Sequence, residues 1–304
     1  MKRSGFSSCL IVAMLFVAST AGAQRVPPLS ESAVLEGAPG SKDAVPIPAG
    51  VKVFFQPEDV AMVTIREGMR RGVVAGNTIS VSVDELDPRF ILGLPPESAH
   101  HHTHEQANFG LVGTLEMYVG GVRSLVGPGM IGVVPPDVPH TVTKVLGPGT
   151  VRSLEFSVAK REDLLPHRPK VEFPKSAEPK GVPGGFRVFA DFDTVEWVGE
   201  PGTSRFTAAF GETCTAFIYH VPAATMKGVE APGHHHHNEQ ISVVLRGRAD
   251  VRLGDRFERV GPGTIMFVPP NVDHYGLASV DGEDLVLLEF QPIVREDMRR
   301  TLAR

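Results

Sequence analysis

Two histidine-rich stretches of the chain have the residue types and the spacing of metal-ligand clusters. Each stretch holds two histidines separated by one residue, then a glutamine four residues further on, and a third histidine 34 residues after that glutamine. Every matched position in the second stretch lies 134 residues after its counterpart in the first. Imidazole nitrogens with one amide oxygen suit a divalent transition metal. The two predicted ligand sets are His100, His102, Gln106 and His140, and His234, His236, Gln240 and His274.

The spacing within each set fits side chains that converge from neighbouring strands. Residues i and i+2 of a strand point to the same face, so His100 and His102 point the same way. Gln106 keeps that parity, whereas Glu105 does not. His140 follows a Pro-Pro turn and would return on a neighbouring strand. We therefore expect one divalent transition metal in each copy, with room for water or substrate; Fe, Mn, Zn, Ni, Co and Cu all remain candidates.

The other histidines of the two stretches do not have this arrangement. A single run could be a solvated loop, but two runs with matching downstream histidines favour metal binding. His101, His235 and His237 have the opposite parity and are expected to face outward. His104, where the second copy has Asn238, could be a base beside the first metal or a solvated loop residue, and we favour the solvated position.

Two glutamates in apolar runs are further candidates for the chemistry. Glu155 and Glu289 occupy matching positions in two Leu-Glu-Phe segments. Each could act as a general base inside a barrel, or could face solvent on the alternate side of its strand, and the sequence favours neither. With His104 they make up the candidate catalytic residues.

The repeat extends well beyond the histidines, which indicates two copies of one domain. Three pairs of matching segments at the offset of 134 residues are Gly127-Pro128-Gly129 with Gly261-Pro262-Gly263, Val134-Pro135-Pro136 with Val268-Pro269-Pro270, and Arg161-Glu162-Asp163 with Arg295-Glu296-Asp297. Earlier in each copy, Val53-Phe54-Phe55 resembles Val188-Phe189-Ala190, with the register shifted by one residue.

The elements that must position these residues are short strands. The chain has 32 Gly and 26 Pro among 304 residues and only 7% aromatics, which favours strands joined by tight turns over long helices. Apolar runs with partial alternation predict strands at 241–245, 249–253 and 264–268. Gly120-Gly121 and Gly254-Asp255 predict hairpin turns. Helix is expected only at the ends of the two copies, over 160–165 and 294–303, so the chain is predicted to be all-β.

The chain divides into five predicted segments. Residues 1–23 read as a signal peptide, because Lys2 and Arg3 precede an apolar run shorter than the roughly 20 residues of a membrane span and small residues follow it. This predicts export to the periplasm, with no membrane attachment after cleavage. The other segments are an extended arm laid across the first domain, the first domain itself, a Pro-rich linker and a second domain, over 24–50, 51–165, 166–184 and 185–304.

Charge and cysteine content exclude other classes. The net charge is −5 and there is no run of Lys or Arg, which argues against nucleic acid or an anionic membrane as a partner. After signal cleavage Cys214 is the only cysteine, so no intramolecular disulfide can form. Its apolar surroundings predict a buried, inert thiol.

These motifs resemble those of the cupin family, and the whole chain resembles a bicupin. Its first motif, His-x-His followed by an acidic ligand and a glycine, is matched up to Gly113 and Gly247 except that glutamine replaces the acid. The second motif ends in the third histidine, and Asp137 and Asn271 stand where it has glycine; both types tolerate a left-handed turn. The resemblance implies two tandem double-stranded β-helix (jelly-roll) barrels, each with a metal inside.

The glutamine ligand bears on the chemistry. A neutral ligand leaves the site one unit more positive, which favours Lewis-acid work on a carbonyl, as in cupin isomerases and lyases. The alternatives are a cupin-type dioxygenase and, in a different class, a non-catalytic metal- or sugar-binding protein. Two complete ligand sets favour an enzyme acting on a small oxygenated molecule. A homodimer is left open, since two barrels in one chain can pair with each other.

Overall fold

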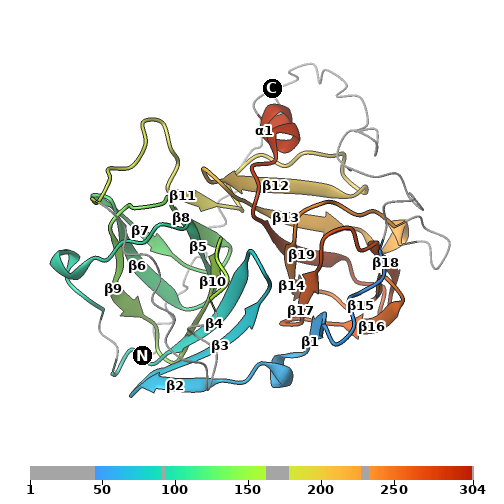
Figure 1. The fold of residues 1–304 in the computed structure, drawn as a ribbon, viewed down its shortest axis with the longest axis horizontal. Helices are drawn as coiled ribbons and strands as arrows, with labels where there is room; N and C mark the ends of the chain where they lie inside the picture. The colour runs from blue at the N-terminus through green and yellow to red at the C-terminus, as the bar shows by residue number, and fades with distance from the viewer. Residues whose placement is uncertain (1–44, 91–92, 162–177, 227–232, 303–304) are drawn as a thin grey trace, which may run out of the picture.

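The computed structural model describes residues 45–90, 93–161, 178–226 and 233–302. These residues form two β-barrels that lie side by side, with one short helix, α1 (Glu296–Leu302), near the C-terminal end (Figure 1). The predicted all-β fold of two jelly-roll barrels is confirmed. The helix expected at 294–303 is α1, while most of the one expected at 160–165 lies outside the described residues. No helix in the described part of the chain is both long and apolar enough to cross a membrane.

The first barrel consists of two antiparallel sheets. The strands of its own sequence are β2 (Val63–Arg66), β3 (Met69–Ala75), β4 (Ser80–Leu86), β5 (Gln106–Val112), β6 (Thr114–Val119), β7 (Val122–Val126), β8 (Met130–Val134), β9 (His140–Leu146) and β10 (Val151–Ser157). The large sheet has the order β8-β5-β10-β4-β3-β2 and the small one β7-β6-β9. Two 3-10 turns flank these strands, η2 (Pro57–Asp59) and η3 (Pro96–Ser98).

The second barrel repeats this plan. Its strands are β12 (Arg205–Phe210), β13 (Thr215–Val221), β14 (Gln240–Arg246), β15 (Ala249–Leu253), β16 (Arg256–Val260), β17 (Ile265–Val268), β18 (His274–Ser279) and β19 (Leu285–Gln291), with the 3-10 turn η5 (Ala223–Thr225) after β13. The large sheet has the order β17-β14-β19-β13-β12 and the small one β16-β15-β18. The three strands predicted from apolar runs are confirmed as β14, β15 and β17.

Tight turns fall where the sequence predicted them. Gly120 and Gly254 adopt positive φ angles of 54° in the turns after β6 and β15. Among the described residues the only non-glycine residues with positive φ are Asp137 (65°) and Asn271 (61°), each shortly before a third ligand histidine. The expectation that these two residues take a left-handed turn in place of glycine is confirmed.

The two barrels exchange short strands. β1 (Phe54–Phe55) precedes the first barrel in the sequence but pairs with β17 of the second, with Phe54 opposite Met266. β11 (Phe189–Asp191) precedes the second barrel but pairs with β8 of the first, with Phe189 opposite Gly132. Figure 1 shows the blue β1 among the orange and red strands and the yellow β11 beside the green ones. Because these segments are repeat equivalents, the exchange is reciprocal.

The residues just before β1 also lie on the second barrel. The backbone N–H of Val45 donates to the carbonyl oxygen of Asn271 at 2.8 Å. Ile47 is buried in the core of the second barrel. Where the arm is described, the prediction that it crosses the first domain is therefore wrong, because its apolar side chain is buried in the second barrel instead.

One hydrophobic core joins the large sheets of both barrels. It contains Ile79 and Phe156 from the first barrel and Ile241 and Phe290 from the second. The rings of Phe156 and Phe290, which are repeat equivalents, stack with 4.9 Å between their centroids. Cys214 is buried in the same core, where burial and then the charge of Glu105 raise the pKa of its thiol, so it is a buried, inert thiol as predicted.

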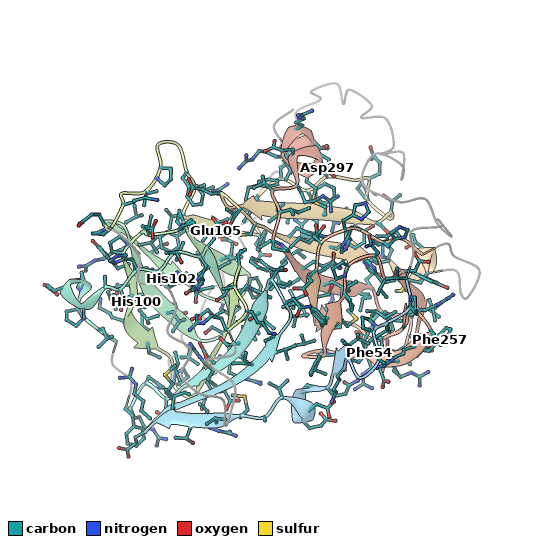
Figure 2. The ribbon with its side chains drawn as sticks, in the orientation of Figure 1. Phe54, His100, His102, Glu105, Phe257 and Asp297 are labelled. Atoms are coloured by element: carbon teal, nitrogen blue, oxygen red, sulfur yellow. The ribbon has the colours of Figure 1, made fainter. Side chains whose placement is uncertain are left out.

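The strand exchange predicts that Phe54 stabilises the second barrel. Phe54→Ala removes a side chain buried in that barrel's core and should lower the free energy of unfolding by about 3 kcal/mol. Trp197, the only tryptophan, contacts β12 and β13, so its fluorescence in a urea titration reports on this barrel. The control, Phe257→Ala on β16, changes an exposed ring (Figure 2) and should cost less than about 1 kcal/mol. Equal effects of the two substitutions would contradict the prediction.

Candidate metal centres

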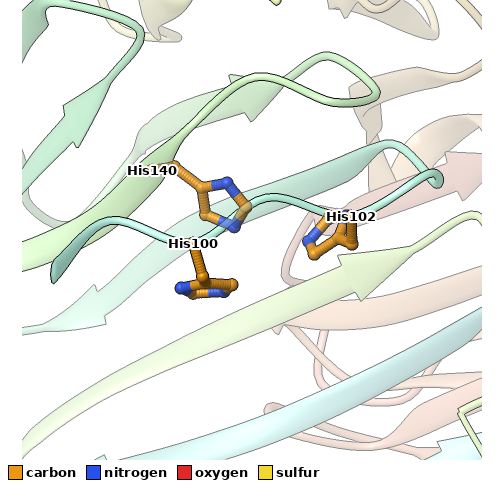
Figure 3. A group of neighbouring side chains, drawn as sticks. All are labelled: His100, His102 and His140. Carbon is orange, nitrogen blue, oxygen red and sulfur yellow. The ribbon is translucent and has the colours of Figure 1, made fainter. Parts of the chain in front are cut away.

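Three histidines of the first barrel converge from two adjacent segments. His100 and His140 form an antiparallel bridge, in which the N–H of each donates to the carbonyl oxygen of the other at 3.1 and 2.8 Å. His102 follows on the same segment as His100. One potential ligand nitrogen from each of the three rings lies within 4.8 Å of the other two. Figure 3 shows the three rings around a common space, as the spacing of the sequence predicted.

Backbone carbonyl groups fix the orientation of the ligand rings. Nδ1 of His102 lies 2.7 Å from the oxygen of His104, and Nδ1 of His140 lies 2.9 Å from the oxygen of Val138. A carbonyl oxygen can only accept, so Nδ1 carries the proton and Nε2 keeps the lone pair that a metal requires. Nε2 of His140 is buried and has no hydrogen-bond partner among the described residues, which fits a ligand atom.

Gln106, the fourth predicted ligand of the first set, lies beside the triad. Its Oε1 lies 3.0 Å from Nε2 of His102. Because Nδ1 of His102 holds the proton, two atoms with lone pairs face each other across this contact. Such a contact is repulsive unless a cation lies beside both atoms or the amide is turned so that its nitrogen donates to His102. The donor set of three imidazoles and one amide oxygen therefore fits a divalent transition metal.

Among the described residues only His100, His102 and His140 bring their ligand atoms within 4.8 Å of one another, but the rings of the second set have a similar arrangement. The ring centroids of His234 and His236 lie 4.2 and 5.0 Å from that of His274, against 4.4 and 4.8 Å for the equivalent pairs in the first barrel. Nδ1 of His236 lies 2.7 Å from the oxygen of Asn238, and Nε2 of His274 is buried without a hydrogen-bond partner among the described residues.

The amide of Gln240 is held more firmly than that of Gln106. Its Oε1 lies 3.1 Å from Nε2 of His236 and accepts a hydrogen bond from Nε2 of Gln291 at 2.5 Å. Its Nε2 donates to Oγ of Ser242 at 2.9 Å. These bonds fix which end of the amide faces the histidines, and it is the oxygen.

The pKa is strongly lowered for three of the predicted ligand histidines, His140, His234 and His274. Burial, followed by the charges of the neighbouring histidines, lowers the pKa of His140 to about 3. The same causes lower the pKa of His234 to about 3 and that of His274 well below its ordinary value. A metal needs the neutral imidazole, so these three rings are ready to bind near pH 7 without first losing a proton.

A polar cavity of about 220 Å³ adjoins the first triad, and its further lining residues are charged. Arg71 on β3 donates from Nε and Nη2 to the two carboxylate oxygens of Asp84 on β4, at 2.5 and 2.6 Å. Arg71 and Arg161 also reach Glu155 on β10, at 3.3 and 3.8 Å. Burial opposes the ionisation of Glu155, but the charges of the two guanidinium groups outweigh it and lower the pKa, so Glu155 is a carboxylate at neutral pH.

A second cavity of about 200 Å³ reaches the same triad with a more apolar wall. Leu86, Leu115, Met117 and Val145 line it, together with His100 and Gln106, and all four apolar side chains are buried. Among its lining residues Leu94 is exposed, so the cavity extends to the surface of the barrel.

The second barrel keeps Arg295 and Glu289 at the positions of Arg161 and Glu155 but has no counterpart of the Arg71–Asp84 pair. In the first barrel Arg71 lies opposite Asp84 across β3 and β4, and in the second barrel the matching positions hold Phe206 opposite Tyr219. Glu289, the equivalent of Glu155, accepts a hydrogen bond from Ser242 at 3.3 Å. Burial raises the pKa of Glu289 to about 7, since its neighbours compensate less for desolvation.

His104 is buried, contrary to the expectation of a solvated loop residue. Its ring stacks on that of His102, with 3.8 Å between centroids and 1° between planes, and it lines the polar cavity. Burial lowers the pKa of His104 to about 3, so it is neutral and only weakly basic at pH 7. The chain between His102 and Gln106 turns inward, so the ring of His104 stacks on His102 instead of lying in solvent.

The outward direction expected for the remaining histidines holds only in part. His237 is exposed and His101 is half-buried, but His235 is completely buried. Nδ1 of His235 lies 2.8 Å from Oδ1 of Asp273, which satisfies one of its nitrogens away from solvent. The expectation for His235 was wrong because alternation along a strand does not reveal a carboxylate partner from a distant segment.

Arg71 and Asp84 were not among the candidates from the sequence. Each stands in a strand-like run, and inward-facing charges in such runs are a signal of a polar barrel interior. Only the register of β3 against β4 shows that the two charges face each other. Of the candidate catalytic residues, the structure puts His104 and Glu155 beside the first triad and Glu289 in the interior of the second barrel.

Comparisons with known proteins agree with this geometry. A family model described as Cupin domain matches residues 90–156 and 224–290, two ranges with the same offset of 134 residues as the ligand sets. Among proteins of curated function, none has a significantly similar sequence.

Solved structures of oxalate decarboxylase share the fold. One, from Bacillus subtilis and concerned with its Mn(II) centres, is 15% identical with a TM-score of 0.59. Another, concerned with the substrate binding mode of oxalate decarboxylase and a switch in its reaction specificity, is 15% identical with a TM-score of 0.60. A mutant of the Bacillus subtilis enzyme is 14% identical with a TM-score of 0.61. Each alignment covers 83% of this chain and 80% of the other, and at these identities the likeness concerns the fold alone.

The two half-buried glutamates Glu155 and Glu289 predict opposite effects of pH on stability. The folded protein keeps a proton on Glu289 up to a pKa of about 7, whereas an unfolded glutamate loses it near 4.5. The free energy of unfolding should thus fall as pH rises from 4.5 to 7, by about 3 kcal/mol from this group. Glu289→Gln should remove that loss and be more stable than the parent at pH 8.

The measurement is urea unfolding of metal-free protein at pH 5 and pH 8. Glu155→Gln is the matched control, since the pKa of Glu155 is lowered and its charge interacts with Arg71 and Arg161. That variant should be less stable than the parent at pH 8. A parent-like pH profile for Glu289→Gln would refute the assignment of a protonated Glu289.

Proposed function

This chain belongs to the cupin superfamily and carries two cupin domains, and on that premise we propose that it is a metal-dependent enzyme of the lyase or isomerase type. Its substrate is a small oxygenated carboxylate with a carbonyl group next to the reacting carbon. The reaction takes place in the first barrel. The observation that carries the proposal is the charged cavity beside the first triad, lined by Arg71, Glu155 and Arg161.

Electrostatics favour an anionic substrate. The four donors of the first site are neutral, so a divalent metal there keeps its full charge. Around it the positive charges of Arg71 and Arg161 are balanced by those of Asp84 and Glu155. The site with its metal thus carries a net positive charge in a partly enclosed cavity, which attracts a carboxylate.

The shape of the first barrel limits the size of the substrate. The polar and the apolar cavity, of about 220 and 200 Å³, have room for a small molecule but not for a polymer. The apolar wall of Leu115, Met117 and Val145 suits the carbon skeleton, while the triad and the arginines suit the oxygen atoms.

Each residue of the first site has a task in this proposal. A bound divalent metal supplies Lewis acidity at the substrate's oxygen atoms. Arg71 and Arg161 hold the substrate carboxylate by charge-assisted hydrogen bonds. Glu155, ionised and within reach of both arginines, accepts or returns the proton at the reacting carbon. His104 stacks on His102 and keeps that ligand ring in place.

The second barrel has a different task. With Phe206 and Tyr219 in place of the Arg71–Asp84 pair, it lacks one of the two arginines that would hold a carboxylate. Its ligand set is complete, so we propose a second metal there whose main contribution is to the stability of the barrel. Export to the periplasm stays a prediction from residues 1–23, which lie outside the described residues.

Metal content tests the first part of the proposal. After loading with a divalent metal and desalting, elemental analysis should find close to two equivalents per chain in the parent. His140→Ala and His274→Ala should each lose one equivalent, because each removes a ligand with a buried, unpartnered Nε2. His237→Ala, at an exposed position, should retain both. If the parent protein binds no metal, the enzyme proposal is refuted, and the protein is a binding module with vestigial ligands.

The carboxylate cluster can be tested by exchanging residues between the repeats. The double variant Arg71→Phe, Asp84→Tyr installs in the first barrel the pair that packs at the matching positions of the second. It should keep both metals but bind small carboxylates such as oxalate or 2-oxo acids about 100-fold more weakly, since charged hydrogen bonds contribute roughly 1.5–3 kcal/mol each.

Calorimetric titration of the metal-loaded parent and variant measures this loss. Release of carbon dioxide or rearrangement of the acid then identifies the reaction in the parent. Consumption of oxygen with either acid would instead assign the protein to the cupin-type dioxygenases. Unchanged affinity in the double variant would show that the cluster does not hold the substrate.

A further inference from the structure

Each metal ligand glutamine is preceded by a buried glutamate that faces away from the metal site. Glu105 precedes Gln106 and Glu239 precedes Gln240, and both glutamates are almost completely buried. Strand parity excluded them as ligands, and both carboxylates do lie at the boundary between the barrels. Figure 2 labels Glu105 on the side of the first barrel that faces the second.

Glu105 of the first barrel is bound by a hairpin turn of the second. The turn joins β12 to β13, and the N–H of Glu212 donates to Oε1 of Glu105 at 2.7 Å. The N–H and the hydroxyl of Thr213 donate to Oε2 at 2.7 and 2.8 Å. Both carboxylate oxygens are therefore satisfied by the opposite barrel.

Glu239 of the second barrel is bound in the same way by the first. The turn between β3 and β4 supplies the N–H groups of Asn77 and Thr78, which donate to Glu239 at 2.7–3.0 Å. The hydroxyl of Thr78 donates to Oε2 of Glu239 at 2.7 Å. Successive N–H groups in a turn form an anion-binding concavity, and here the anion is a side chain of the neighbouring barrel.

Two glycines leave the space that these carboxylates occupy. A Cβ atom on Gly211 would lie 2.4 Å from both oxygens of Glu105. A Cβ atom on Gly76 would lie 2.7 Å from Oε2 of Glu239 and 2.5 Å from the ring of Phe267, so Thr78→Val is the cleaner test of this contact. Neither glycine has a positive φ angle, so close approach rather than backbone conformation explains the glycine at each position.

The glutamates connect these turns to the ligands through the backbone. The carbonyl of His104, directly before Glu105, accepts the hydrogen bond that orients His102. The carbonyl of Asn238, directly before Glu239, does the same for His236. In each barrel the residue after the glutamate is the ligand glutamine. Moving either glutamate would displace an oriented imidazole and an amide donor together.

We propose that Glu105 and Glu239 are positioning residues that make the metal affinity of each barrel depend on a turn of the other barrel. The first site depends on the Gly211–Thr213 turn of the second barrel, and the second site on the Gly76–Thr78 turn of the first. The inference rests on the metal sites of the proposed function. It predicts a crossed pattern that a contact serving only to hold the barrels together would not produce.

The experiment measures each site separately in the full-length chain. His274→Ala leaves only the first site intact and His140→Ala only the second. Into each background we would introduce Gly211→Ala or Gly76→Ala, and determine the affinity for Zn²⁺ by competition with a chromogenic chelator. Gly149→Ala and Gly261→Ala are matched controls, because a Cβ atom there meets nothing closer than 3.5 Å.

Gly211→Ala should weaken Zn²⁺ binding at the first site about 10- to 100-fold, as loss of support behind a metal ligand does, and leave the second within about twofold. Gly76→Ala should do the reverse, and the two controls should change neither. Thr213→Val and Thr78→Val remove only one hydroxyl donor and nearly preserve shape. They should give the same crossed pattern with smaller changes, even if the alanine variants fold poorly.

The failure of this inference can be distinguished from failure of the proposed function. If both single-site backgrounds bind Zn²⁺ and the turn variants only lower the unfolding temperature, the contacts hold the barrels together and do not position ligands. Equal weakening of both sites by one turn variant would also overturn the crossed dependence. If neither background binds Zn²⁺, the metal sites of the proposed function are refuted, and this inference falls with them.

Discussion

The packing of the two large sheets against each other is the constraint on which the rest of the structure depends. Phe156 and Phe290 stack at equivalent positions of the two repeats, so the core has an approximate twofold arrangement. That arrangement brings the β3–β4 turn of one barrel and the β12–β13 turn of the other to equivalent places on the partner barrel. The strand exchange and the two glutamate contacts are further consequences of the same geometry.

Within this symmetric frame the two interiors have diverged. Both keep three neighbouring imidazoles, two of them oriented by backbone carbonyl groups, and a glutamine oxygen close to Nε2 of one ring. The barrels differ in the residues around these ligands: Arg71 and Asp84 on β3 and β4 correspond to Phe206 and Tyr219 on β12 and β13. The pKa of the matching glutamate depends on these neighbours: it is lowered for Glu155, beside two arginines, and raised to about 7 for Glu289. Duplication has thus preserved the ligands while the surrounding electrostatics changed.

Features of the site that depend on local spacing could be predicted from the sequence. Features that depend on contacts between distant segments could not. The approach of His100, His102 and His140 to one another was predictable because strand parity and an exact repeat restrict them. The importance of Arg71 was hidden, since it depends on the register of two strands. The burial of His235 depends on Asp273, 38 residues away in the chain. The choice of β17 as the partner of β1 depends on how two barrels pack, which apolar character alone does not specify.

The strand exchange has a consequence for the origin of the chain. Because β1 and β11 are equivalent segments that cross in opposite directions, a single-domain protein with this fold would have its edge strand on another molecule. Its smallest closed assembly would be a domain-swapped pair related by a twofold axis. Joining two such genes through a linker would convert that intermolecular exchange into the intramolecular one seen here. The exchanged strands are then a record of an ancestral homodimer within the present-day chain.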